Sequence, residues 1–378
     1  MNKVTILIIL VFCLLMMWVF LFSIRGGNDT SEGLPVPRKS EESKDVIVSI
    51  DELCERINEE ISNGNNGTLS FYISEYVTDD DIKKINYSID STKGTVKSVA
   101  TYTSSTGNGL SYRRVELDYE KSDTLFVYES IVEGKPIPAE RTKAKQLEGV
   151  CRDVLSMNIR PEMSDYEKEL AIHDYIVNSC EYGNSLSNDD SEFSAYGVLV
   201  NNRAVCSGYA AAMQLLLSCS GVESNIVTGE ADSITNSSGK ENHAWNQVKI
   251  DGTWYNLDAT WDDPVGEEEV LAHTYFNIDD GILSRTHKWD GKKANACISM
   301  KDNYYKHNGA YFTDLPSLEA YFKTEFMGGT KQVAECAVDN IPINDESLQF
   351  LFDINGVSSV SYSTSGNTKY DIVTVYIK

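Results

Sequence analysis

The sequence is short of positive charge and of proline. Lys and Arg number 33 against 57 Asp and Glu, so the net charge is −24 over 378 residues, and only 8 residues are proline. A surface of this sign repels phosphate backbones and anionic headgroups, so we expect no nucleic-acid partner and no adhesion to lipid by charge alone. The 41% of apolar residues excludes a disordered or collagen-like chain and allows two or three folded domains.

Paired metal-binding motifs are also absent. The sequence has eight cysteines but no CxxC pair and no HExxH, which excludes a zinc ribbon, a thioredoxin-like motif and a zincin. The cysteines are sparse and irregularly spaced, unlike those of a disulfide scaffold. We therefore expect no cofactor and no metal.

One long apolar run is present, from Val4 to Phe22, with Thr5 as its polar member. As a helix it would span about 28 Å at ~1.5 Å per residue, close to the ~30 Å hydrocarbon core of a bilayer. A cleaved signal peptide is the alternative, but no pair of small residues marks a cleavage site after the run. We predict an uncleaved single-pass anchor over 1–25 and a flexible linker, rich in Gly, Ser, Pro and charge, over 26–44. Since such N-terminal runs usually direct export, we expect the folded part to be extracytoplasmic, although the Lys and Arg counts do not decide the orientation.

Two flanking segments, 45–140 and 309–378, show the same order of predicted elements: helix, strand, helix, strand, strand. In the first segment these elements are expected near 50–61, 68–74, 78–85, 96–103 and 110–119. In the second they are expected near 317–326, 331–338, 344–352, 357–362 and 370–377. We infer one small α/β module used twice, which packs against the middle segment or binds another protein.

The middle segment, 141–308, contains a cysteine at a predicted helix start. Strong helix formers follow Ser207-Gly208, so Cys206 lies at or near the helix N-terminus. The unpaired amides and the dipole at that end favour a negative charge such as a thiolate. Taken alone, a cysteine beside an apolar helix is more often a buried core residue.

A predicted hairpin downstream supplies two partners for the thiol. Asp251-Gly252 separates two strand patterns and is a strong hairpin signal. With these two residues as the loop, Trp245 faces Asp258, and His243 lies on the same face as Trp245. His243 and Asp258 then become diagonal neighbours, whereas a register shift of one residue would put them on opposite faces. A thiol, an imidazole and a carboxylate are the three parts of nucleophilic catalysis, although each residue alone could be structural.

The sequence around these residues resembles the transglutaminase-like superfamily, in particular its bacterial extracytoplasmic members. The resemblance covers about 165–290 and is carried by the segments 195–210, 243–246 and 254–264, with the helix at 167–175 before them. It implies an α+β fold with a papain-like core, in which the cysteine helix packs on an antiparallel sheet. By that resemblance Cys206 is the nucleophile, His243 the base and acid, and Asp258 the orienting group.

The chemistry that the resemblance implies is acyl transfer through a thioester on a protein or peptide amide. The acceptor can be an amine, giving cross-linking, or water, giving deamidation or proteolysis, and the sequence does not choose. A cell-envelope protein is one candidate substrate. The alternative is a catalytically silent binding or scaffold protein with the same fold.

Several further residues have two readings. The Cys206 amide is one candidate oxyanion donor, and Tyr196 and Ser207 are weaker candidates. Trp245 and Trp261 either line the substrate cleft or belong to the core. Asp262 and Asp263 precede Pro264 and are turn formers, since one acidic pair is too few ligands for calcium. We expect three other histidines of this segment to be structural, namely His173, His273 and His287. A zinc site from Cys206, His243 and a third ligand has little support without paired motifs.

Overall fold

The computed structural model describes residues 46–378, except for 63–66, 84, 86–92, 106–110, 184–189, 233–238, 264–270, 292–293 and 366–368. The predicted anchor and linker lie outside the described residues. Among the described helices, none combines the length and the apolar character that crossing a membrane requires. The chain divides into two compact units, 1–129 and 130–378.

The first unit is a four-stranded sheet with one long helix. Its elements are β1 (Val46–Ile47), α2 (Ile50–Ser62), β2 (Gly67–Ser74), α3 (Asp79–Lys83), β3 (Gly94–Ser105) and β4 (Ser111–Lys121). The strand order is β1-β2-β4-β3, with β1 parallel to β2 and the other pairs antiparallel. Leu53, Ile57 and Ile61 recur at helical spacing and are buried with Val115 and Leu117 of the sheet. This unit therefore has a core of its own.

The C-terminal part of the second unit repeats that topology. Its elements are β11 (Tyr311–Phe312), α12 (Leu315–Glu325), β12 (Val333–Val338), η2 (Gln349–Asp353), β13 (Val360–Ser365) and β14 (Asp371–Ile377). The order β11-β12-β14-β13 has the same parallel and antiparallel pairs as the first unit. The leading strands β1 and β11, two residues each, were not expected from the sequence, because two residues carry no periodicity.

The helix predicted at 344–352 is wrong in type and length. The structure has a turn from Asn344 to Ser347 followed by the short 3-10 helix η2. The Asn344 and Ser347 side chains hydrogen-bond to each other's backbone amides. Such local bonds compete with a regular helix, which explains the difference.

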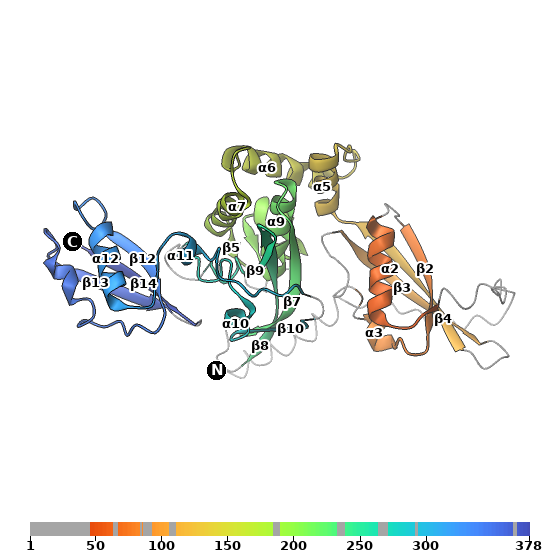
Figure 1. Ribbon diagram of the computed structural model, residues 1–378. Coiled ribbons are helices and arrows are strands. Elements are labelled where there is room, and N and C mark those ends of the chain that lie inside the picture. Colours follow the sequence, from red (N-terminus) through yellow and green to blue (C-terminus); the bar gives the residue numbers. More distant parts are fainter. Residues whose placement is uncertain are drawn as a thin grey trace, which may run out of the picture. The chain divides into compact units, whose positions relative to one another are not determined.

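The middle part of the second unit places a helix on an antiparallel sheet. The helices are α5 (Asp123–Glu133), which crosses the boundary between the units, α6 (Thr142–Asn158), α7 (Asp165–Ser179), η1 (Asp190–Phe193), α8 (Ala195–Leu199), α9 (Cys206–Cys219), α10 (Asp280–Leu283) and α11 (Tyr304–His307). The strands are β5 (Glu181–Tyr182), β6 (Arg203–Ala204), β7 (Ser224–Asp232), β8 (Lys240–Ile250), β9 (Thr253–Leu257) and β10 (His287–Trp289), with the sheet order β10-β7-β8-β9. Helix α9 packs against β7 and β8 on one side and against α7 and α8 on the other (Figure 1). The predicted arrangement of cysteine helix and sheet is thus present.

Helix α9 is fixed to the sheet by its composition. Nine of its residues are buried, including Tyr209 and Leu216, so it is apolar on nearly every face, as a central helix must be. Asn246 of β8 donates its side-chain amide to the backbone oxygen of Ala210 at 3.0 Å. The position of the helix start relative to β8 is therefore set by packing and by a buried hydrogen bond.

The hairpin of β8 and β9 has the predicted register. Asp251 and Gly252 form its loop with φ of 49° and 81°, and Ile250 pairs with Thr253 at the end of the ladder. Two positive φ values are the signature of the tight turn whose twist matches the strands. The ladder brings Asp258 just beyond the end of β9, beside the middle of β8.

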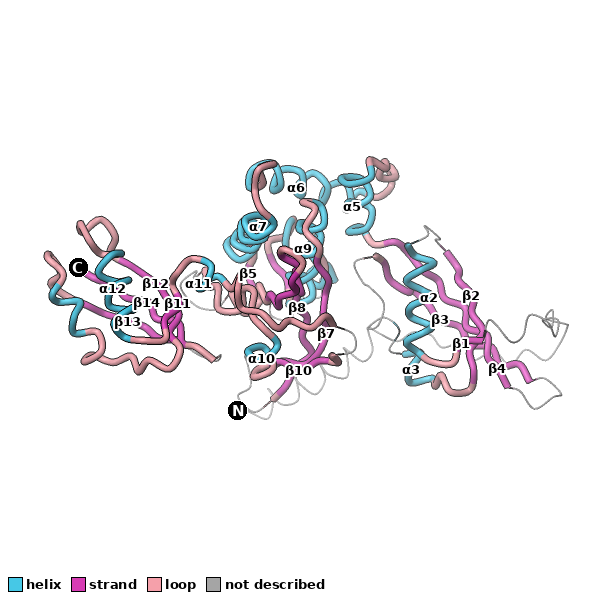
Figure 2. The backbone as a smooth tube through the Cα atoms, in the orientation of Figure 1, coloured by secondary structure: helices cyan, strands magenta, loops and turns pink. Residues whose placement is uncertain are grey.

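The C-terminal module shares a core with the middle part. One buried cluster runs from Trp245 and Tyr275 to Val373 and Val375, and the Tyr370 hydroxyl donates to the backbone oxygen of Thr274 at 2.8 Å. Figure 2 shows the strands of this module joined to the middle part through α11. The segments predicted as 141–308 and 309–378 therefore lie in one compact unit.

Candidate active site

Cys206 is the first residue of α9. Val205 before it is extended, and no side chain caps the helix, so the first amides of the helix are available to a negative charge. Two residues later, a side chain on Gly208 would meet the backbone oxygen of Glu192 at 2.5 Å. Glycine is therefore required there for the helix start to approach η1. Cys206 is partly exposed, whereas five other cysteines in the described part of the chain are buried.

His243 and Asp258 form a buried pair beside Cys206. Nε2 of His243 lies 2.7 Å from Oδ2 of Asp258, and both side chains are less than 5% exposed. His243 also hydrogen-bonds to the Cys206 side chain. Since Nε2 is bonded to the carboxylate, Nδ1 is the ring nitrogen that remains for the thiol. The two histidine nitrogens thus connect the carboxylate to the sulfur.

The charges of this pair stabilise each other. Burial alone would lower the pKa of His243, but Asp258 and Cys206 raise it to about 10. Burial alone would raise the pKa of Asp258, but His243 and His287 hold it well below its ordinary value. At neutral pH the site therefore holds an imidazolium beside a carboxylate.

Asp258 is held at both of its oxygens. Oδ1 accepts from the backbone amides of Thr260 and Trp261 at 3.1 and 3.3 Å. Oδ2 accepts from His243 and, at 3.0 Å, from Nε2 of His287. The expectation that His287 is merely structural is therefore incomplete, because it shares one oxygen with His243. Sequence reasoning missed this contact because His287 is 29 residues away and follows a stretch without regular periodicity.

Tyr182 is a second residue that sequence reasoning missed. Its hydroxyl hydrogen-bonds to the backbone of Cys206, and burial is the main cause of its raised pKa. Tyr182 belongs to β5, which pairs with β6 directly before the cysteine helix. Strands of two residues leave no pattern in a sequence, so no signal pointed to this tyrosine.

Two of the predicted cleft residues, Tyr196 and Trp245, have contacts that do not fit that role. The Tyr196 hydroxyl donates to Oε1 of Gln146 on α6 at 2.7 Å, so its position does not support an oxyanion role. Trp245 is 1% exposed and packs against His287 and Trp289. Of the two readings that the sequence leaves open for Trp245, the core reading is therefore correct, and its ring centroid lies 6.1 Å from that of His243.

The other two predicted residues stay near the site. Trp261 is partly exposed, and its ring centroid lies 6.0 Å from that of His243 and 4.7 Å from that of His287. The Ser207 hydroxyl is buried and makes no hydrogen bond within the described part of the chain. Both residues remain candidates for contacts with substrate.

A second polar cluster lies behind the loop that follows Asp258. His173 and His273 both lie about 3 Å from Oδ1 of Asp174, at 3.0 and 2.9 Å, and Nε2 of His173 lies 3.3 Å from Oδ2 of Asp262. Burial lowers the pKa of His173, but the two carboxylates raise it to about 9. Asp262 is thus a buried ion-pair partner and more than a turn former. Asp263 accepts from the Tyr209 hydroxyl.

Among the residues that the structure describes, two groups of side chains have donor atoms close enough to hold a metal ion. The groups are His173, Asp174 and His273, and His243, Asp258 and His287, with donor atoms within 4.8 Å of one another in each group. In both groups the histidine nitrogens already hydrogen-bond to the carboxylate between them. Hydrogen bonding therefore explains each arrangement without an ion.

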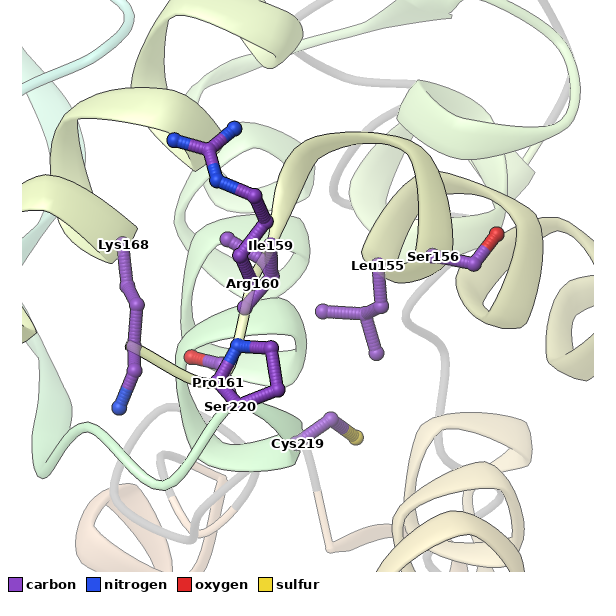
Figure 3. Close-up of a pocket in the computed structure, with 8 residues that line it drawn as sticks. All are labelled: Leu155, Ser156, Ile159, Arg160, Pro161, Lys168, Cys219 and Ser220. Atoms are coloured by element: carbon purple, nitrogen blue, oxygen red, sulfur yellow. The ribbon is translucent and has the colours of Figure 1, made fainter. Parts of the chain in front are cut away.

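A surface hollow lies at the other end of the cysteine helix. It is lined by Leu155, Ser156, Ile159, Arg160, Pro161, Lys168, Cys219 and Ser220 (Figure 3). Cys206 and Cys219 begin and end the 14-residue helix α9, so they are about 20 Å apart at ~1.5 Å per residue. The hollow is therefore separate from the Cys206 site.

Comparison with known proteins finds similarity that includes the middle of the chain. Residues 153–259 match the model of the Transglutaminase-like superfamily. The chain is 26% identical over 265 residues to the human protein named Kyphoscoliosis peptidase, covering 65% of this chain and 37% of that protein. The mouse protein of the same name is 28% identical over 222 residues, covering 54% of this chain and 33% of that protein. The chain thus spans about a third of the length of these curated relatives.

Two solved structures are among those similar to this chain. One described as a TGase is 16% identical, covers 57% of this chain and 59% of that chain, and has a TM-score of 0.26. LapG of Legionella pneumophila in its calcium-bound form is 12% identical, covers 48% of this chain and 98% of that chain, and has a TM-score of 0.25.

Proposed function

We propose, from the transglutaminase-like core that the chain contains, that it is a cysteine enzyme that transfers or hydrolyses acyl groups of protein or peptide amides. Cys206 is the nucleophile, His243 the base and acid, and Asp258 the group that orients His243. The observation that carries this proposal is the continuous set of contacts from Asp258 through His243 to the sulfur at the start of α9.

The roles follow from the chemistry of these contacts. The Cys206 thiolate attacks the amide carbon, and His243 gives its proton to the leaving amine as the C–N bond breaks, which leaves a thioester on Cys206. An amine or water then attacks the thioester carbon, His243 accepts the proton of the attacking group, and the C–S bond breaks, which returns Cys206 as the thiolate. The developing oxyanion needs donors near Cys206, and the candidates are the Cys206 amide, the Ser207 hydroxyl and the Tyr182 hydroxyl.

The acyl acceptor is the finer part of the proposal. The two mammalian relatives are named as peptidases, which favours hydrolysis, so we place peptidase activity first and amine transfer second. For either acceptor the substrate is a protein or peptide, and the flanking modules are candidates for binding it.

Location is a proposal of the same kind. The apolar run Val4–Phe22 supports a single-pass anchor with the folded part outside the cytoplasm. Extracytoplasmic substrates, including proteins of the cell envelope, are then within reach of the site.

The test measures both outcomes in one reaction. The full chain is incubated with an extract of envelope proteins and a biotin-labelled primary amine, and the products are examined for labelled glutamines and for new N-termini. We expect one of the two products with the natural chain and neither with the Cys206→Ala variant. Products that persist in the variant would contradict the proposal. Cells that carry the Cys206→Ala variant and keep the phenotype of cells with the natural chain would favour the scaffold alternative.

A further inference from the structure

We propose that His287 is a positioning residue for the triad: a neutral imidazole whose Nε2–H fixes the Asp258 oxygen that His243 uses. This inference rests on the proposed function, since it assigns His287 a part in the same site. His287 is fully buried, so it does not touch substrate and acts through Asp258.

The first argument is geometric. Oδ2 of Asp258 receives Nε2 of His243 at 2.7 Å and Nε2 of His287 at 3.0 Å. Without His287, that oxygen would be held by His243 alone, and Oδ1 by two backbone amides of the following turn. With both bonds made to Oδ2, the carboxylate cannot rotate so as to move this oxygen away from His243. A shift of the turn is prevented in the same way.

The second argument concerns the proton. An ionised carboxylate only accepts hydrogen bonds, so Nε2 of His287 must carry a hydrogen. Nδ1 of His287 lies 2.8 Å from the Thr286 hydroxyl, whose other acceptor is the backbone oxygen of Leu283 at 3.4 Å. When the hydroxyl gives its hydrogen to the nearer of these two acceptors, His287 is the neutral tautomer with hydrogen on Nε2, because the histidine then has one donor and one acceptor, each with a partner.

The third argument is electrostatic. The groups that act on His287 are Asp258, the imidazolium of His243 and the ammonium of Lys240. Burial and the two cations disfavour a charge on His287, and together they outweigh Asp258, so the pKa of His287 is lowered. A neutral donor supports Asp258 without cancelling the negative charge that stabilises His243 as an imidazolium, whereas a second imidazolium would cancel it.

The surroundings keep the ring in place. The centroids of Trp261, Trp245 and Tyr275 lie 4.7, 5.1 and 5.9 Å from that of His287. These aromatic rings exclude water from the Asp258 oxygen and leave His287 one orientation. The buried Trp245, which is not a cleft residue, thus belongs to the packing that supports the site.

The experiment compares His287→Leu with His287→Gln in the full chain. Glutamine places an N–H donor near the position of the histidine Nε2, whereas leucine fills similar space without a donor. The readout is the rate at which iodoacetamide alkylates Cys206 at pH 6, with thermal unfolding to verify that each variant is folded. A hydrogen bond to a charged group is among the stronger hydrogen bonds in proteins. We therefore expect His287→Leu to lower the alkylation rate of Cys206 about 10-fold or more relative to the natural chain. His287→Gln should restore most of that rate.

The outcomes separate this inference from the proposed function. Slow alkylation of the natural chain contradicts the proposed function itself. Fast alkylation of the natural chain, unchanged in His287→Leu, overturns the role of His287 and leaves the proposed function intact. A folded His287→Gln variant as slow as His287→Leu also overturns it, because packing and not the donor would then matter.

A second measurement needs no variant and holds even if the leucine variant does not fold. Nitrogen-15 chemical shifts of the histidine rings in the natural chain report which nitrogens carry hydrogen. We expect His287 to have hydrogen on Nε2 and none on Nδ1 from pH 6 to 8. An imidazolium, or the tautomer with hydrogen on Nδ1, would overturn the inference.

Discussion

At the scale of single residues, the site depends on two histidines that share one carboxylate oxygen. His243 carries the charge and reaches the sulfur, whereas His287 is fully buried and contacts the same oxygen of Asp258. The different surroundings of the two rings separate their protonation states: the pKa of His243 is raised and that of His287 is lowered. Such divergence between neighbouring titratable groups is typical of sites that move protons.

The raised pKa of His243 predicts a pH-dependent contribution to stability. A histidine whose pKa rises on folding stabilises the fold fully below its unfolded value of about 6.5, and the contribution is lost as pH rises toward the folded value. With a folded pKa of about 10, the loss falls between pH 6.5 and 10. We expect the natural chain to exceed His243→Gln in free energy of unfolding by a constant amount below pH 6 and by a shrinking amount above pH 7.

Urea unfolding of both proteins at pH 5, 6, 7, 8 and 9 measures this difference. The glutamine variant keeps a donor toward Asp258 but has no titratable ring, and titratable groups away from the site cancel in the comparison. A difference that stays level from pH 6 to pH 9 would show that His243 is not held as an imidazolium.

The sequence predicts the part of the site that local geometry determines. His243 and Asp258 meet because a two-residue turn fixes the register of one hairpin. Asp251-Gly252 is the sequence signal that predicts this turn. Tyr182 and His287 reach the site through tertiary packing. Tyr182 belongs to β5, a strand of two residues, and His287 belongs to β10, a short strand far along the chain. No local pattern encodes contacts of that kind, so they became visible only in the structure.

At the scale of elements, the hairpin positions two members of the triad and the helix start positions the third. The long strands and helices of the chain have apolar periodicities, and for that reason the sequence predicts most of them. Two long elements, α5 and β7, were not predicted, and the other missed elements are short: β1, β11, β5 and β6 have two residues each, and η2 replaces a predicted helix. Elements of this length are held by their neighbours and not by a pattern of their own.

The turn of the hairpin offers a test at this scale. Gly252 has a φ of 81°, and no atom lies within 4 Å of the position that a Cβ would take there. A side chain is therefore opposed by backbone conformation and not by a clash. We expect Gly252→Ala to lower the free energy of unfolding by about 1 kcal/mol. Because the ladder of β8 and β9 holds the register, Cys206 should keep its reactivity.

Gly149 provides the matched control. It lies exposed within α6, with no positive φ and an open position for a side chain. Gly149→Ala should therefore raise the free energy of unfolding by about 0.5–1 kcal/mol, in the opposite direction. Urea unfolding of the two variants checks the pair, and equal effects in the same direction would contradict the assignment of the turn.

At the scale of the whole molecule, the chain uses one topology twice around a different core. The first unit and the C-terminal part have sheets of the same strand order and the same pairing directions. The C-terminal copy shares its core with the middle part, through residues such as Phe322, Tyr370 and Val373. The first unit has a separate core. Sequence pattern predicts the repeat, whereas the sharing of a core depends on side chains that no periodicity identifies.

The separate core of the first unit predicts that the site does not need it. We expect the fragment 122–378, which keeps α5 complete, to fold cooperatively and to show the same rate of Cys206 alkylation as the full chain. Circular dichroism on heating and the alkylation rate check the two statements. A folded fragment with a slow Cys206 would show that the first unit takes part in forming the site.

The measurement that tests the central claim most directly is the alkylation of Cys206 by iodoacetamide at pH 6, mapped to each cysteine by mass spectrometry. Cys219 is the internal control, since it is also partly exposed but burial raises its pKa to about 12, and ordinary thiols react little at this pH. We predict fast and selective labelling of Cys206, falling to the rate of Cys219 in His243→Ala. A Cys206 that reacts no faster than Cys219, or that is indifferent to the loss of His243, would contradict the account.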